Sequence, residues 1–427
     1  EADVHALLAG NDVLLFPEDV PKAIKKIKEA LDSNLISFDE INAHCRKILM
    51  AKQWAGLNRY QKIKTKNLIK DLNNIHADLL NKQLTEESLT LLQNKNNFIP
   101  LNNLQTLSIA SIALGSKEQT LFQQTLSNYI NVKHYTIIKD AKQEGYDTLL
   151  AQLKKYNTLI VQLASTHFLA SKDYGLTTQQ ANFVKQLISL NVHVVVVVPS
   201  NPYILNRLDS IQFADAVVMA YEDTDNSQNA TAQLIFGGIA AKGKLPVSAG
   251  IYKAGTGILT KTVRFKYTTP EELGIDAKYL ARIDTIALKG IRDKVYPGCQ
   301  IFIAKDGKVF YQKSFGHHTY DRKQKVLNSD IYDLASVTKI AASTPCVMKL
   351  SDEKKINVDE KLVTYLPQLK GTNKEKIVIR EMMAHQAGLR EWIPFWMRTM
   401  KDGKYDSAIY RTTAEGNFTS RVAEDLF

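Results

Sequence analysis

The sequence predicts a multidomain α/β protein. Its 427 residues exceed what one ordinary hydrophobic core organises, so about two to four domains are expected. Six short apolar runs alternate with helical segments between residues 89 and 220, which indicates a mainly parallel sheet with helices on both faces. Two later apolar runs, joined by an Asp-Gly turn, indicate a β-hairpin in a further domain.

The composition is typical of a folded, globular protein. Hydrophobic residues make up 44% of the chain and charged residues 23%, so wholesale disorder is not expected. The formal charge of +11 comes from lysines dispersed along amphipathic helices, without a basic patch interleaved with aromatics, so nucleic-acid binding is not expected. No apolar run approaches the roughly 20 residues that span a bilayer, so we expect no transmembrane segment in this chain.

The sequence carries no metal or cofactor motif. The three cysteines, Cys45, Cys299 and Cys346, are far apart, and no close Cys/His spacing accompanies them. No glycine-rich phosphate loop follows any of the apolar runs. We therefore expect no disulfide framework, no metal site and no cofactor.

The first 57 residues predict a helix, a turn, a strand and two further helices. Gly10 and Asn11 suit the end of a helix, and the apolar run Val13–Phe16 predicts a strand buried on both faces. Pro21 is typical of a helix start, and Ser37 with Glu40 forms a capping-box pattern at the start of the next helix. The order of elements is an alternation of α and β.

This N-terminal stretch resembles the end of the barrel domain of glycoside hydrolase family 3, in its β-N-acetylhexosaminidase branch. The residues that carry the resemblance are 9–17 and several positions of 36–57. It implies that residues 1–57 are the C-terminal part of a TIM-type barrel, and that the glycosidase nucleophile and acid/base lie upstream, outside this chain. Asp12 is then a turn residue. Because a retaining glycosidase needs two groups around the scissile bond, this segment is not expected to hydrolyse a glycoside alone.

Residues 58–88 predict linking helices, and residues 89–250 predict the α/β domain. The six apolar runs that indicate its strands are Leu89–Leu92, Leu107–Ala113, Tyr135–Ile138, Thr158–Leu163, Val192–Val198 and Ala216–Ala220. The domain resembles the α/β sandwich domain of family 3, on the segments 91–101, 175–177, 230–238 and 243–248.

Four polar residues fall in loops at the ends of the predicted strands. Ligands of open α/β sheets bind at such strand ends. The other interpretation, which we favour, is that they are solvated loop residues, because the resemblance gives none of them a catalytic role. His193, inside the valine run, is interpreted as an ordinary strand residue. The four loop residues are His167, Asp173, Asp223 and Asp225.

Residues 251–268 predict a linker, and residues 269–427 open a further domain. A helix is expected at 277–289, followed by Pro297-Gly298 and by strands at Gln300–Ala304 and Val309–Gln312. The turn between these strands, Lys305–Lys308, contains the Asp-Gly pair that is typical of a tight hairpin.

Ser336 and Lys339 stand three residues apart at a predicted helix start, in the stretch Asp333-Leu-Ala-Ser-Val-Thr-Lys. One helical turn places a hydroxyl and an amine at this spacing on the same face. A lysine in a partly desolvated pocket can lose its proton and act as the base that activates a serine. Taken alone, the pattern also fits an N-cap serine followed by a solvated lysine.

The surrounding segments favour the catalytic interpretation. The order of helix, Pro-Gly, hairpin, Ser-x-x-Lys and long helix, continued by residues 355–367 and 379–389, resembles the serine β-lactamase-like fold of class C β-lactamases, penicillin-binding proteins and related esterases. The resemblance implies that residues 269–427 are the N-terminal part of an α+β serine hydrolase domain. Ser336 is then the acylated nucleophile, Lys339 helps to deprotonate it, and the Ser336 amide is one oxyanion-hole donor. His385 is then structural, and no convincing Tyr-x-Asn or Lys/His-x-Gly follows it.

Together the two resemblances imply part of a bacterial bifunctional hydrolase. One activity is O-glycosyl hydrolysis of the β-N-acetylglucosaminidase type, on glycan or peptidoglycan-derived substrates. The other is Ser-Lys hydrolysis of an acyl or β-lactam-like substrate. The alternative is a catalytically silent glycan-binding or scaffold fragment. We expect the chain to be truncated at both ends and inactive alone, and the parent protein to be exported to the periplasm or cell envelope.

Overall fold

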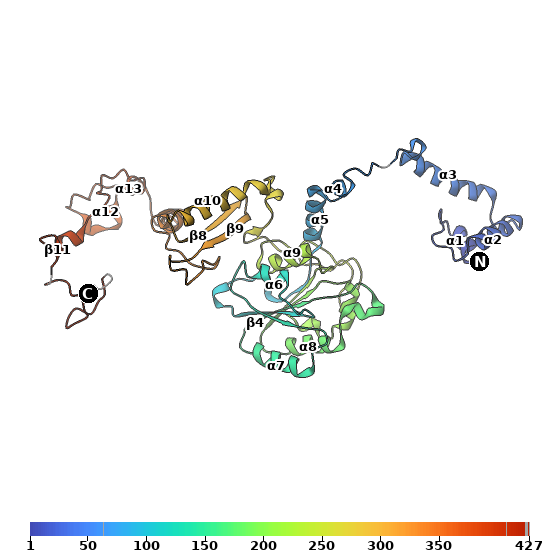
Figure 1. Cartoon of the computed structure of the whole chain (residues 1–427), viewed down its shortest axis with the longest axis horizontal. Helices are drawn as coiled ribbons and strands as arrows, with labels where there is room; N and C mark the ends of the chain where they lie inside the picture. The colour runs from blue at the N-terminus through green and yellow to red at the C-terminus, as the bar shows by residue number, and fades with distance from the viewer. Residues whose placement is uncertain (63, 407, 423–425, 427) are drawn as a thin grey trace. The chain divides into compact units, whose positions relative to one another are not determined.

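The computed structural model describes residues 1–62, 64–406, 408–422 and 426. It divides into two compact units, Glu1–Ser329 and Asp330–Phe427, and the chain is drawn in Figure 1. The domain limits predicted from the sequence stay predictions. No helix among the described residues is both long and apolar enough to cross a membrane.

The first part of the chain is helical. The helices are α1 (Ala2–Leu8), α2 (Val20–Asp32), α3 (Phe38–Trp54), α4 (Leu68–Leu72) and α5 (Ile75–Ser88). Their starts follow the predicted signals. Asp19 caps α2 ahead of Pro21, and Ser37 and Glu40 form the predicted capping box at the start of α3.

The predicted strand at Val13–Phe16 is wrong. Leu15 is 82% exposed and Phe16 is 91% exposed, and no described strand pairs with this segment. An apolar run becomes a buried strand only where a neighbouring strand satisfies its backbone N–H and C=O groups and other elements cover its faces. The described residues provide neither, and the assignment of residues 1–57 to a barrel stays a prediction.

The centre of the first unit is a six-stranded sheet with the order β1-β6-β5-β4-β2-β3. The five strands β2 to β6 are parallel, and β1 pairs with β6 in the antiparallel direction. All six strands predicted from apolar runs are confirmed, and so is the mainly parallel sheet. Their bounds are β1 (Thr90–Asn94), β2 (Ile109–Leu114), β3 (Lys133–Ile137), β4 (Thr158–Leu163), β5 (His193–Val198) and β6 (Ala216–Met219).

Helices cover both faces of this sheet (Figure 1). On one face, Val194 and Val196 of β5 share a buried cluster with residues of α7 (Gln143–Leu153) and α8 (Thr178–Ile188). On the other face, Val195 and Val197 share a cluster with residues of α6 (Leu121–Leu126) and α9 (Asp225–Phe236). Successive side chains of a strand point to opposite faces, so an unbroken valine run is what a doubly covered strand requires.

A smaller sheet with the order β7-β9-β8 follows in the same unit. It comprises β7 (Lys266–Tyr267), β8 (Gly298–Lys305) and β9 (Lys308–Gly316), and α10 (Ala281–Arg292) precedes the hairpin. At the turn, Asp306 and Gly307 have φ angles of 51° and 73°, as a two-residue type I′ turn requires. The predicted hairpin is confirmed.

The second unit contains short elements. A π-helical turn at Lys339–Ser343 leads into α11 (Thr344–Asp352), followed by α12 (Leu362–Tyr365), α13 (Ile379–Met383), β10 (Met400–Lys401) and β11 (Lys404–Tyr405). Ile377 and Ile379 are buried, with exposed fractions of 8% and 5%. Many large apolar side chains of this unit, such as Ile340 at 72%, are exposed.

Candidate active site

Ser336 lies in a tight turn at the start of a helical segment. The Asp333 carboxylate accepts a hydrogen bond from the Ala335 N–H at 2.8 Å, and Ala335 adopts a φ of 42°, in the left-handed region. Such a conformation costs a non-glycine residue about 1–2 kcal/mol and is frequent at functional sites. The N–H of Lys339 then donates to the carbonyl of Ser336 at 3.1 Å, which starts the helical turn.

The structure brings Ser336 and Lys339 together. Lys339 Nζ lies 3.0 Å from Ser336 Oγ and donates a hydrogen bond to it. The contact follows from the three-residue spacing, because one helical turn stacks the two side chains on one face. No described carboxylate lies within ion-pairing distance of Lys339. The amine therefore has the serine hydroxyl, and no described acid, as its side-chain partner.

The backbone N–H of Ser336 is a hydrogen-bond donor without an acceptor in the described part of the chain. Among the residues that the structure describes, none accepts a hydrogen bond from the Ser336 N–H. An amide at the start of a helix points its N–H outward, where negative charge is favoured. The Ser336 amide thus has the position that a donor to an oxyanion would need.

Lys339 begins the π-helical turn, which the sequence reasoning did not predict. Pro345 has no N–H to donate to the carbonyl four residues before it, so the regular α-helical bond is missing at that position. The Thr344 hydroxyl donates to the carbonyl of Lys339, five residues before it, at 2.9 Å. Pro345 is the sequence signal that could have indicated this widening, and π-turns are frequent at functional sites.

His385 and Tyr410, the tyrosine nearest to the C-terminal end of the chain, have no hydrogen bond to Ser336 or Lys339 among the described residues. His385 follows α13 with a φ of 57°. The Tyr410 hydroxyl is 2.8 Å from that of Thr399. The structural role predicted for His385 stays a prediction.

Asp223 and Asp173, two of the polar residues at the strand ends of the large sheet, have protein partners. Asp223 is half-buried, accepts hydrogen bonds from the Ser165 N–H at 2.8 Å and Gln228 Nε2 at 2.9 Å, and burial raises its pKa. Asp173 pairs with Arg207, and the first residue of α9 is Asp225. These contacts orient the loops, and none of them provides a nucleophile with a base.

Asp12 and the histidines of unit 1 also have local partners. Hydrogen bonds from His44 and Lys47 lower the pKa of Asp12, whose Oδ1 lies 2.6 Å from His44 Nδ1. His167 Nδ1 accepts from the N–H of Leu169 at 3.0 Å. His193 begins β5, where its Nδ1 lies 2.9 Å from Asp215 Oδ1.

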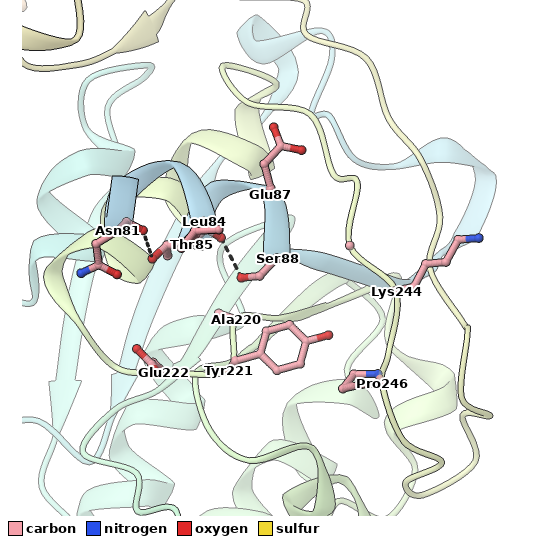
Figure 2. A pocket seen from close by; sticks show the side chains of 11 residues that line it. Asn81, Leu84, Thr85, Glu87, Ser88, Ala220, Tyr221, Glu222, Lys244 and Pro246 are labelled. Atoms are coloured by element: carbon pink, nitrogen blue, oxygen red, sulfur yellow. Dashed lines mark hydrogen bonds between the residues drawn. The ribbon is translucent and has the colours of Figure 1, made fainter. Parts of the chain in front are cut away.

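A polar pocket of about 530 Å³ lies at the end of β6, a feature that the sequence reasoning missed. Tyr221 and Glu222 follow β6 below the last turn of α5, which contributes Ser88 (Figure 2). The Tyr221 hydroxyl lies 2.7 Å from Thr90 Oγ1, and Thr90 donates its own proton to the Ser88 carbonyl at 2.9 Å. Tyr221 is therefore the donor to Thr90, and this bond fixes its ring against the pocket.

Gly243 lets the chain approach this pocket closely. A Cβ at this position would lie 2.2 Å from the carbonyl oxygen of Ser88 and 2.4 Å from Thr90 Oγ1, so a side chain cannot be accommodated there. Nearby, Glu87 pairs with Lys242 at 2.5 Å, which leaves Glu222 and Lys244 as the unpaired charges of the pocket among the described residues. An aromatic ring with hydroxyl, amide and balanced charged groups suits a neutral, polyhydroxylated ligand.

Two families of known proteins match successive parts of this chain. Residues 89–279 match the glycosyl hydrolase family 3 C-terminal domain, and residues 283–414 match the beta-lactamase family. The chain combines these two domains. The large sheet lies in the first match, and Ser336 and Lys339 lie in the second. Both are hydrolase families. The predicted resemblances to the family 3 α/β domain and to the serine β-lactamase-like family are confirmed at the level of family and fold.

Curated relatives match about a quarter of this chain. Protein flp of Staphylococcus aureus (strain NCTC 8325 / PS 47) is 33% identical over 112 residues, which cover 25% of this chain and 22% of the relative. A putative D-alanyl-D-alanine carboxypeptidase of Salmonella heidelberg (strain SL476) is 30% identical over 135 residues, which cover 28% of this chain and 31% of the relative. The match thus spans less than a third of either relative's length.

Solved structures of family 3 enzymes align with more than half of this chain. A glycoside hydrolase family 3 β-N-acetylglucosaminidase from Paenibacillus sp. str. FPU-7 aligns with a TM-score of 0.41 and 22% identity, over 59% of this chain and 48% of that one. A β-glucosidase from Listeria innocua in complex with isofagomine aligns with a TM-score of 0.41 and 17% identity, over 57% of this chain and 37% of the β-glucosidase.

Proposed function

We propose that this chain is part of a bifunctional hydrolase and that Ser336 and Lys339 carry its serine hydrolase activity. The observation that supports the proposal is the 3.0 Å contact between Lys339 Nζ and Ser336 Oγ, inside the segment that matches the beta-lactamase family. The serine is the nucleophile, the lysine is its base, and the Ser336 N–H stabilises the oxyanion.

The reaction is acyl transfer in two steps. The amine of Lys339 takes the proton of Ser336, and Oγ attacks the carbonyl carbon of the acyl substrate. The tetrahedral oxyanion collapses to an acyl-serine ester, and the leaving group departs with the proton. Water then attacks the ester, which releases the acid and restores the serine hydroxyl. The acyl substrate is a peptide, an ester or a β-lactam, and the peptide class accords with the name of the carboxypeptidase relative.

Labelling of a protein that carries the complete serine hydrolase domain with a fluorophosphonate probe, read by peptide mass spectrometry, tests this assignment. We expect the label on Ser336, no label in Ser336→Ala, and labelling slowed about 10²-fold or more in Lys339→Met, the usual loss when a general base is removed. Ser351→Ala, at a serine near the end of α11, is the matched control and should label normally. Labelling that persists in Ser336→Ala would exclude Ser336 as the nucleophile.

The second activity belongs to the family 3 part. We expect a protein that carries this chain together with the family 3 catalytic residues to release nitrophenol from a β-N-acetylglucosaminide at a site separate from Ser336, as the match of residues 89–279 supports. The substrates are then glycan or peptidoglycan-derived, and the protein acts after export, in the periplasm or cell envelope. Nitrophenol release by Ser336→Ala at the wild-type rate is the expected result, and its loss would contradict separate sites.

A second candidate function is glycan binding without turnover. The pocket around Tyr221 favours it, because that pocket has an oriented aromatic ring with polar groups around it. Isothermal titration with chitotriose distinguishes the two functions. Saturable binding that Tyr221→Ala abolishes, in a protein that turns over neither substrate, would favour the binding function. Turnover of either substrate would contradict it.

A further inference from the structure

A second hollow, of about 730 Å³, lies at the end of α10 and is lined by cations. Its basic lining residues are Arg292, Lys294, His317 and Arg322, and no aspartate or glutamate lines it. All of them belong to the unit Glu1–Ser329. We call this hollow the α10 basic pocket.

Backbone contacts set the walls of the α10 basic pocket. The Tyr320 hydroxyl donates to the carbonyl of Lys294 at 2.8 Å, and the N–H of His317 donates to the carbonyl of Pro297 at 3.0 Å. Gly316 permits this approach, since a Cβ there would lie 2.3 Å from the Pro297 carbonyl oxygen. These hydrogen bonds join the two loops that carry the cations, and none of them involves a cationic side-chain group.

The carboxylates beside these cations in sequence pair with Lys289, Arg292 and Lys323, and not with Lys294 or Arg322. Asp293 pairs with Lys289, and its Oδ1 is 3.8 Å from Arg292 Nε. Asp321 pairs with Lys323 at 3.2 Å and accepts a hydrogen bond from Thr319. Within the described residues, the side chains of Lys294 and Arg322 therefore have no acidic partner, although each follows an aspartate directly.

We propose that the α10 basic pocket binds a phosphate-type oxyanion. Like charges gathered around one hollow repel one another, and an anion at its centre removes that cost. The Arg322 guanidinium offers the fork that matches two phosphate oxygens, and Lys294 adds a compact second charge. Two permanent cations balance a dianion. The volume is in the range of small-ligand sites, so the phosphate can be free or carried on a larger molecule.

Isothermal titration calorimetry of the full chain at fixed ionic strength tests the proposal. The probes are inorganic phosphate, glycerol 3-phosphate and malonate. We expect saturable one-to-one binding of inorganic phosphate, weakened about tenfold or more by Lys294→Gln and by Arg322→Gln, since each removes a hydrogen bond to a charged group. Binding of glycerol 3-phosphate at least as tight would indicate a phosphate ester, and much weaker binding would indicate free phosphate.

Lys323→Gln is the matched control. It removes one positive charge next to Arg322, from a side chain that is paired with Asp321 and does not line the pocket. We expect it to change phosphate binding less than twofold. Three results would overturn the proposal: no saturable binding of phosphate, an equal loss in Lys323→Gln, or malonate binding as tightly as inorganic phosphate.

Discussion

The large sheet of the first unit and the turn that carries Ser336 in the second are stabilised in opposite ways. Val194 to Val198 of β5 are at most 1% exposed, and their side chains pack against helices from distant parts of the sequence. Val337, next to Ser336, is 52% exposed, and the turn is held by hydrogen bonds between residues two to three positions apart. The sheet thus depends on long-range burial, whereas the candidate catalytic pair depends on local geometry.

The largest effect should come from placing one carboxylate in each region. Val196→Asp buries an unpaired charge at a position with 0% exposure and should lower the free energy of unfolding by more than about 4 kcal/mol. Val337→Asp places the same side chain in a solvated turn and should change the free energy of unfolding by less than about 1 kcal/mol. Urea denaturation monitored by circular dichroism measures both, and similar losses would contradict the comparison.

The next largest effect should come from the buried ion cluster between α5, β7 and β9. Burial favours the neutral form of Glu272, but hydrogen bonds from Lys266, Lys308, Thr268 and Lys82 outweigh it and hold the pKa of Glu272 well below its ordinary 4.5. Glu272→Gln leaves these lysines without that carboxylate and should cost about 2–3 kcal/mol. Glu87→Gln, in an exposed pair with Lys242, is the control and should cost less than about 1 kcal/mol.

The same cluster gives a pH dependence with a definite sign. Because the folded-state pKa of Glu272 is depressed, its contribution is complete above about pH 4.5 and is lost as the pH falls below that value. The urea midpoint of the wild type should therefore drop more steeply below pH 4.5 than that of Glu272→Gln. Parallel pH profiles would show that Glu272 makes no such contribution.

A smaller pH effect is expected from His134 at the edge of the large sheet. Its ring nitrogens lie 2.7 Å from Ser111 Oγ and 2.8 Å from Ser127 Oγ, and burial lowers its pKa below the ordinary 6.5. As the pH falls, the unfolded chain therefore binds this proton at a higher pH than the folded chain does. The free energy of unfolding should then rise with pH up to about 6.5. His134→Asn should remove that rise from urea midpoints measured between pH 5 and 7. A rise that persists in His134→Asn would show that other titratable groups cause the pH dependence.

The smallest effect on stability should come from the candidate catalytic pair. Ser336→Ala and Lys339→Met remove a hydrogen bond between exposed side chains, and each should change the free energy of unfolding by less than about 0.5 kcal/mol. The same variants should abolish or slow labelling by the fluorophosphonate probe. A large loss of stability in either variant would mean that the pair has a structural role instead.

The sequence by itself determined the features that depend on neighbours within one turn or one strand. The six strands of the large sheet followed from apolar runs, because a strand covered on both faces needs every residue apolar. The hairpin at Asp306-Gly307 followed from the left-handed turn that glycine permits. The proximity of Ser336 and Lys339 followed from helical geometry, since three residues return the chain to the same face.

Only the tertiary structure decided the features that join distant segments. Val13–Phe16 has the composition of a buried strand, yet no described strand pairs with it, and pairing is not a property of the segment alone. The pocket at Tyr221 needs Ser88, Thr90 and Gly243, and the α10 basic pocket needs two loops whose cations stand far apart in the sequence. Such sites arise from long-range packing, which no local pattern of residue types records.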